Sequence, residues 1–67
     1  MRKILITGGS GFIGTNLVEF LSENDRYEIM SLDLVKPKIE SHQQYWAQID
    51  LRRHDDVVSA VESFAPD

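Results

Sequence analysis

Apolar residues occur along this chain in two kinds of pattern, continuous short runs and runs with helical spacing. A continuous apolar run over residues 3–7 predicts a β-strand that is covered on both faces. Apolar residues then recur with helical spacing over 13–23, which predicts a helix. Further strands are predicted over 27–32 and 45–49, and a second helix over 54–64. This alternation of strands and helices indicates an α/β fold with parallel strands.

Each predicted helix carries one apolar face. In the first helix the apolar face comprises Ile13, Leu17, Phe20 and Leu21, and Val18 lies near its edge. This face is expected to pack on the sheet. In the second helix the apolar face comprises Val57, Val58, Ala60, Val61 and Phe64. The segment 34–44 is too polar for an amphipathic helix, so we expect a crossover loop with at most one loose turn.

Composition narrows the range of functions. The chain has 67 residues, enough for one small domain with a thin stability margin. Its net charge is −4, from 11 acidic and 7 basic residues, which argues against nucleic acid as the main partner. It has no cysteine, and His42 and His54 lack ligand spacing, so we expect surface histidines and no metal site. No run has transmembrane length, and we expect a cytoplasmic protein.

The glycines between the first strand and the first helix carry the main chemical signal. Their spacing is Gly8-x-x-Gly11-x-x-Gly14, with a strand before and a helix after. A helix start presents unpaired N–H groups and partial positive charge, and glycines let a phosphate come close to the backbone. The alternative is that these glycines only form a turn.

Acidic residues follow the second and third predicted strands. Asp33 lies 25 residues after Gly8, near the offset at which an acid binds the ribose of a dinucleotide. A carboxylate there would repel a 2′-phosphate, which favours NAD over NADP, although Lys36 and Lys38 leave NADP possible. Asp33 could instead be a loop carboxylate or a helix cap. Asp50, taken alone, is better explained as the end of a strand.

Residues 6–14, Ile-Thr-Gly-Gly-Ser-Gly-Phe-Ile-Gly, resemble the extended short-chain dehydrogenase/reductases, the NAD-dependent epimerase/dehydratase family. The resemblance covers the whole chain. It implies the N-terminal part of a Rossmann doubly wound parallel sheet, with three strands in the order 3-2-1 and two helices. It also implies that Gly8, Gly11 and Gly14 form the pyrophosphate loop of an NAD(P) site.

The resemblance implies roles for five more residues. Phe12 and Ile13 would offer backbone amides to the phosphates, while the side chain of Ile13 is expected in the core. Asp33 would bind the adenosine ribose. Asp50 and Leu51 would flank the adenine, with Asp50 facing its amino group.

No catalytic residue is expected within residues 1–67. The family's catalysis resembles hydride transfer assisted by a Tyr-x-x-x-Lys pair, and neither Tyr27 nor Tyr45 has a lysine four residues later. The chain therefore resembles the NAD(P)-binding front portion of an oxidoreductase acting on a nucleotide-sugar, and is itself catalytically incomplete. A non-catalytic NAD(P)-binding sensor of the same fold is the alternative, and a fragment that binds nothing is a third.

The strand order has a consequence for the first strand. In the family a fourth strand pairs with the free side of residues 3–7. Without that strand, an apolar strand has an open edge, so we expect self-association through it.

Overall fold

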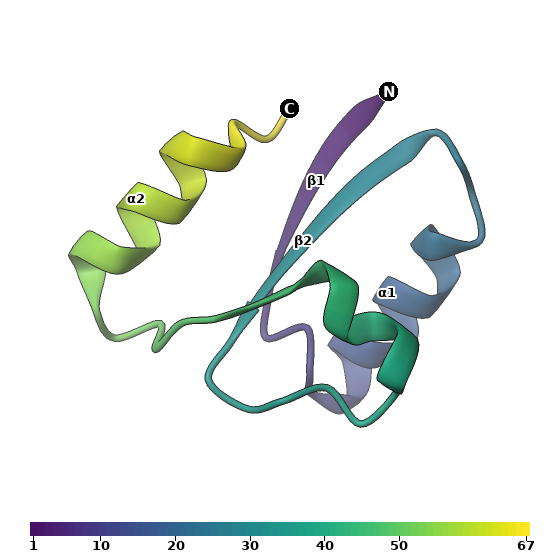
Figure 1. Ribbon diagram of the computed structural model, residues 1–67, viewed down its shortest axis with the longest axis horizontal. Helices are drawn as coiled ribbons and strands as arrows, with labels where there is room; N and C mark the ends of the chain where they lie inside the picture. The colour runs from purple at the N-terminus through teal and green to yellow at the C-terminus, as the bar shows by residue number, and fades with distance from the viewer.

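Three parallel strands form one sheet, with the two longer helices on either side of it in the view of Figure 1. This arrangement comes from a computed structural model, which describes residues 1–67. The elements in chain order are β1 (Arg2–Thr7), α1 (Phe12–Ser22), β2 (Tyr27–Asp33), the 3₁₀ helix η1 (Glu40–Tyr45), β3 (Trp46–Gln48) and α2 (His54–Phe64). The α/β class and the predicted positions of the strands and helices are confirmed.

The strand order follows the prediction. β2 lies between β1 and β3, and both pairings are parallel. β1 pairs along its whole length with β2, from Arg2 opposite Tyr27 to Thr7 opposite Leu32. β3 is shorter than the predicted strand over 45–49, because only three of its residues pair with β2.

The core lies between α1 and the sheet. Ile6 of β1, Ile29 of β2 and Val18 of α1 form its buried cluster, and Leu21 packs against it. Leu32 at the end of β2 has no exposed surface. Because the sheet has only three strands, this core is small, and its stability depends on few contacts.

The rotation of α1 differs from the prediction. Val18 is 1% exposed, whereas Ile13 is 79% and Phe20 72% exposed. Leu17 is also exposed, so most of the predicted apolar face points away from the sheet, and the core position expected for Ile13 was wrong. The face turned towards the loop carries Gly14, where a Cβ would collide with the carbonyl oxygen of Gly8. In this rotation Gly14 faces the loop, and the buried position Val18 follows it at helical spacing.

α2 covers the sheet only at its C-terminal end. Phe64 is buried, with the Lys3 ammonium 4.8 Å from its ring centre. Val58 and Val61 are exposed, contrary to the prediction, because α2 packs against the edge strand β1 and no strand lies beyond β1. Neither α1 nor α2 is long and apolar enough to cross a membrane.

The segment expected as a loop contains η1, a six-residue 3₁₀ helix rather than one loose turn. His42, expected at the surface, is 2% exposed, and its Nε2 lies 2.7 Å from Oε2 of Glu19 on α1. His54 is exposed, as predicted. η1 therefore docks on α1 through a polar contact, which a hydropathy pattern does not reveal.

The outer edge of β1 is only partly paired. The Lys3 N–H donates to Oδ2 of Asp67 at 2.7 Å, and the Asp67 N–H donates to the Lys3 carbonyl at 2.9 Å. In a β-strand the N–H and C=O groups of one residue point to the same side of the strand, and this side alternates from each residue to the next. Lys3 faces outward, so Leu5 and Thr7 face outward too, and no partner strand covers them.

We predict that this open edge makes the chain self-associate, because exposed N–H and C=O groups are templates for another strand. Sedimentation velocity from about 1 µM to about 1 mM should show mass increasing with concentration. Thr7→Pro should shift the chain to monomer, since proline removes an outward N–H without removing a bond to β2. A wild-type monomer over the whole range contradicts the prediction.

Candidate functional site

The carboxyl ends of the three parallel strands meet at one edge of the sheet, where α/β proteins usually bind ligands. β1 leads into the glycine loop, β2 ends at Asp33, and β3 is followed by Asp50. The Ser10 N–H donates to Oδ2 of Asp33 at 3.1 Å, which joins the loop to β2. The Ile49 N–H donates to the Asp33 carbonyl at 3.2 Å, which places Asp50 beside them. The structure therefore brings the predicted residues to one edge.

The glycines of the loop differ in what the fold requires of them. Gly8 has φ +74°, which favours glycine. A Cβ on Gly9 would collide with the Ser31 side chain, and one on Gly14 with the Gly8 carbonyl. Gly11 is different, because its φ is −78° and an added Cβ would lie an ordinary 3.5 Å from Gly8. The fold alone therefore does not require glycine at this position. A Cβ on Gly11 would instead occupy space beside the loop that a ligand could use.

The first turn of α1 presents unpaired donors beside Gly11. No side chain caps the helix, and none of the hydrogen bonds in the structure is donated by the N–H of Phe12, Ile13 or Gly14. Thr15 is the first helix residue whose N–H is paired, with the Gly11 carbonyl at 2.8 Å. These amides lie at the positive end of the helix dipole. The arrangement suits an anion.

Asp33 is held by hydrogen bonds at the end of β2. Its two carboxylate oxygens accept hydrogen bonds from the N–H groups of Ser10 and Val35, at 3.1 and 3.0 Å. Its carbonyl accepts from Nε1 of Trp46 at 2.8 Å. Asp33 thus has the structural role of a loop carboxylate. Each oxygen has a second lone pair, so the same group can still accept a ligand hydroxyl.

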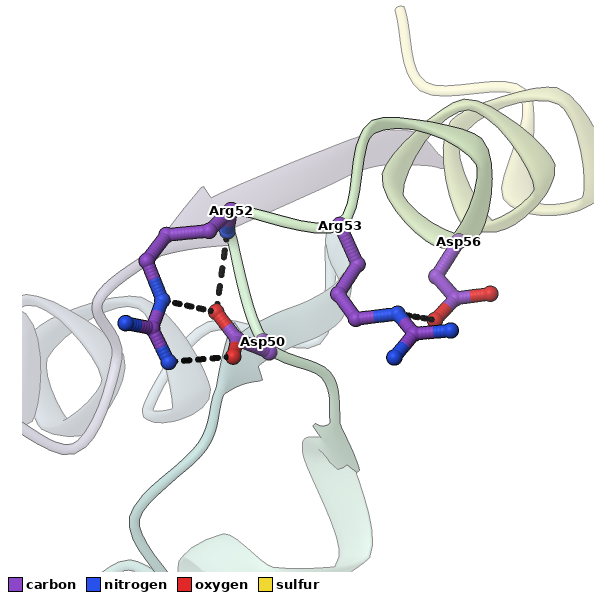
Figure 2. A network of polar contacts seen from close by, with 4 residues as sticks. All are labelled: Asp50, Arg52, Arg53 and Asp56. Atoms are coloured by element: carbon purple, nitrogen blue, oxygen red, sulfur yellow. Dashed lines mark hydrogen bonds and ion pairs between the residues drawn. The ribbon is translucent and has the colours of Figure 1, made fainter.

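Asp50 is paired with Arg52, as Figure 2 shows. The guanidinium donates from Nε to Oδ1 at 3.0 Å and from Nη2 to Oδ2 at 2.8 Å, and the Arg52 N–H donates to Oδ1 at 2.9 Å. These bonds lower the pKa of Asp50 from 3.8 to about 2 and raise that of Arg52. Asp50 is therefore an oriented anion. Leu51, beside it, is 44% exposed.

The second ion pair in Figure 2 belongs to the helix start. Arg53 is the N-cap residue of α2, and its side chain makes no capping bond. Its Nε instead lies 3.3 Å from Oδ2 of Asp56 in the first turn. Both partners are largely exposed, so this pair contributes little to stability.

Sequence comparison identifies the family. Residues 4–67 match the model of the NAD dependent epimerase/dehydratase family. The chain belongs to this family. It is 33% identical over 66 residues to a dTDP-4-dehydrorhamnose reductase of Aggregatibacter actinomycetemcomitans, covering 98% of this chain and 18% of the relative.

Two further relatives show how wide the family is. A 3-beta-hydroxysteroid dehydrogenase of Mycolicibacterium neoaurum is 38% identical over 62 residues, 91% of this chain and 17% of the relative. UDP-glucuronic acid decarboxylase 5 of Arabidopsis thaliana is 38% identical over 56 residues, 79% of this chain and 16% of the relative. This member of the epimerase/dehydratase family thus spans less than a fifth of the length of these relatives. No solved structure matches it.

Family membership implies a nicotinamide dinucleotide cofactor, and the site fits one. The unpaired amides of the first turn of α1 suit a phosphate, and the space above Gly11 lets one approach the backbone. The Ser10 hydroxyl is buried without a hydrogen-bond partner, as expected where a ligand completes a polar site.

Sequence reasoning missed three residues at this edge. Gly9 was part of the motif, but its contact with Ser31 appears only when β2 is placed beside the loop. Ser10 donates to Asp33 through its backbone N–H, and the residue type at a position does not predict such a bond. Arg52 carried a weak signal, since an arginine two residues after an acid can reach back to it.

We predict that Gly14→Ala lowers the free energy of unfolding by about 2–3 kcal/mol, because the new methyl overlaps backbone atoms that cannot yield. Gly11→Ala is the matched control, with the same added methyl in the same loop, and should change stability by less than about 1 kcal/mol. Urea unfolding followed by circular dichroism measures both. Equal losses at the two positions would refute this account of Gly14.

The Asp50–Arg52 pair generates a prediction about pH. Because the folded pKa of Asp50, about 2, lies below its ordinary 3.8, the pair stabilises the fold above pH 3.8. That contribution is lost as pH falls towards 2. Arg52→Gln should return the pKa of Asp50 towards 3.8, whereas Arg53→Gln should change it little, because Arg53 makes the smallest contribution. Carbon-detected NMR titration of the Asp50 carboxyl checks this, and an unchanged value in Arg52→Gln would contradict it.

Proposed function

We propose that residues 1–67 form the cofactor-binding front portion of an NAD-dependent oxidoreductase and hold the adenosine diphosphate half of the cofactor. One observation carries the proposal: unpaired amides of the first turn of α1 lie beside Gly11, a glycine that the fold does not require. In this proposal the amides of Phe12, Ile13 and Gly14 bind the pyrophosphate. Gly8 supplies the turn that places the loop beneath it.

The carboxylates hold the adenosine. Asp33 accepts hydrogen bonds from the ribose hydroxyls through its free lone pairs, and its backbone bonds keep it in place. Asp50, oriented and kept ionised by Arg52, accepts a hydrogen bond from the adenine amino group. Leu51 offers an exposed apolar side chain against the base. The negative charge of Asp33 favours NAD over NADP.

We assign the rest of the proposed activity to a longer parent protein, of which residues 1–67 would be one part. The family and the names of relatives such as the dTDP-4-dehydrorhamnose reductase and the UDP-glucuronic acid decarboxylase support a nucleotide-sugar substrate. When bound, the dinucleotide supplies the nicotinamide that exchanges a hydride with substrate. Residues 1–67 contain no Tyr-x-x-x-Lys pair, so we assign catalysis to the remainder of the parent and expect this chain alone to be inactive.

Isothermal titration calorimetry on the 67-residue chain tests the proposal. NAD and ADP-ribose should bind with similar affinity, because the nicotinamide has no partner among these residues. Gly11→Ala should weaken both at least about 10-fold, since its methyl occupies the space of the pyrophosphate. Circular dichroism should show that this variant remains folded. No heat from either compound at about 1 mM would overturn the proposal.

A further inference from the structure

One flank of α1 is apolar and uncovered. Ile13, Leu17 and Phe20 are spaced four and three residues apart, so they lie along the same side of the helix, and all three are exposed. Glu19 lies about 200° around the helix from Leu17, because each residue turns the helix by about 100°. The Glu19 carboxylate contacts His42 of η1, so the apolar flank points away from η1.

The contact with η1 shows which edge of the sheet this flank faces. η1, which lies beside α1 in Figure 1, runs directly into β3, so the Glu19 side of α1 faces the β3 side of the sheet. Because β2 separates β3 from β1, the opposite flank of α1 is turned towards the edge of β1. That edge is open at Leu5 and Thr7, whereas Lys3 is paired with Asp67. Apolar side chains and unpaired backbone groups therefore form one continuous surface.

A partner for this surface must supply a β-strand for the open edge and an apolar helix flank above that strand. A second copy of the chain supplies both from the same surface. A two-fold axis at the edge of β1 places each strand against its counterpart and each α1 flank against its counterpart, as in other isologous dimers. The flank side chains carry no charge, so the negative net charge of the chain is not concentrated at this contact.

We propose that two copies of this chain pair through antiparallel β1 strands, about a two-fold axis that passes beside Ile6. In this register Leu5 of one copy lies opposite Thr7 of the other, and the two exchange both backbone hydrogen bonds. The pairing of Lys3 with Asp67 is left in place. The two three-stranded sheets join into one, with both α1 helices on the same face. The inference goes beyond the proposed function and does not depend on it.

The same axis aligns the two α1 helices. Val18 packs against Ile6, and Leu17 is its neighbour in the helix, so Leu17 lies level with the axis and meets Leu17 of the other copy. The two helices run in opposite directions. Phe20, nearly one turn beyond Leu17, therefore meets Ile13 of the other copy, about one turn before it. The register that pairs the strands is thus also the one that matches the apolar flanks.

The area of this surface predicts a weak dimer. From their exposed fractions, the three flank side chains present roughly 350 Å² of apolar surface in each copy. With the paired strand edges, two copies bury about 1,000 Å² in total, at the lower end of specific interfaces. We expect a Kd on the order of 10–100 µM, since area alone does not give high affinity.

Sedimentation velocity from about 1 µM to about 1 mM tests the surface on α1. The wild-type mass should rise from monomer and stop at dimer, because the remaining sheet edge, β3, has only three residues. Phe20→Glu should weaken the dimer at least about 10-fold, since it places a charge against Ile13 of the other copy. Phe12→Glu is the matched control on the same helix, at a more exposed phenylalanine outside the flank, and should leave the mass unchanged. Circular dichroism should show that both variants remain folded.

A single cysteine tests the axis, because the chain has none of its own. Leu17→Cys should form a disulfide between two copies in oxidising buffer, since the two side chains meet at the axis. Phe12→Cys is the control for random collision and should be cross-linked far more slowly.

Four outcomes would overturn the proposal. A wild-type chain that stays monomeric to about 1 mM would leave this surface to a different partner. Growth beyond dimer would show open-ended strand pairing without the two-fold axis. A dimer unaffected by Phe20→Glu would exclude the flank of α1, and a Leu17→Cys variant that cross-links no faster than Phe12→Cys would exclude the axis.

Discussion

The first turn of α1 rests on the carbonyl of Gly8, and this contact determines how the rest of the structure is arranged. It is possible only because Gly14 has no side chain. With Gly14 against the loop, Val18 and Leu21 follow at helical spacing and pack on the sheet. The helix therefore begins directly above the end of β1, and its unpaired amides lie at the edge where Asp33 lies. The absence of a side chain at Gly14 thus permits both the packing of α1 on the sheet and the position of its first turn at the candidate site.

The sequence was sufficient for β1 because a continuous apolar run of this length predicts a strand. It was insufficient for α1, where apolar residues cover a broad arc and hydropathy favoured the face with Ile13 and Phe20. On the observed face Gly14 lies against the backbone of Gly8, and a close contact between backbone atoms cannot be read from hydropathy. His42 was missed for a related reason. Its burial depends on a hydrogen bond to Glu19, a partner 23 residues away.

The candidate site also has features that the sequence predicts and features that only the structure reveals. The meeting of the glycine loop and Asp33 at one edge could be predicted, because both follow the carboxyl ends of parallel strands. The hydrogen bond from Ser10 to Asp33 could not, because a backbone N–H is available at almost any residue. The difference between Lys36 and Lys38 also needed the structure. Both are exposed lysines in the same short segment, and only Lys38 lies beside Ser10 and Gly11.

The two acids at this edge are held by different means, and that difference bears on what each can do. Asp33 accepts neutral backbone donors, so its negative charge is only partly offset and remains available to discriminate among ligands. Asp50 is neutralised by a guanidinium at 2.8 Å, so it can orient a hydrogen bond without adding a net charge. An uncharged base would suit the environment of Asp50, and a ribose would suit that of Asp33. Charge compensation, rather than the presence of a carboxylate, therefore supports the different roles that we propose for the two acids.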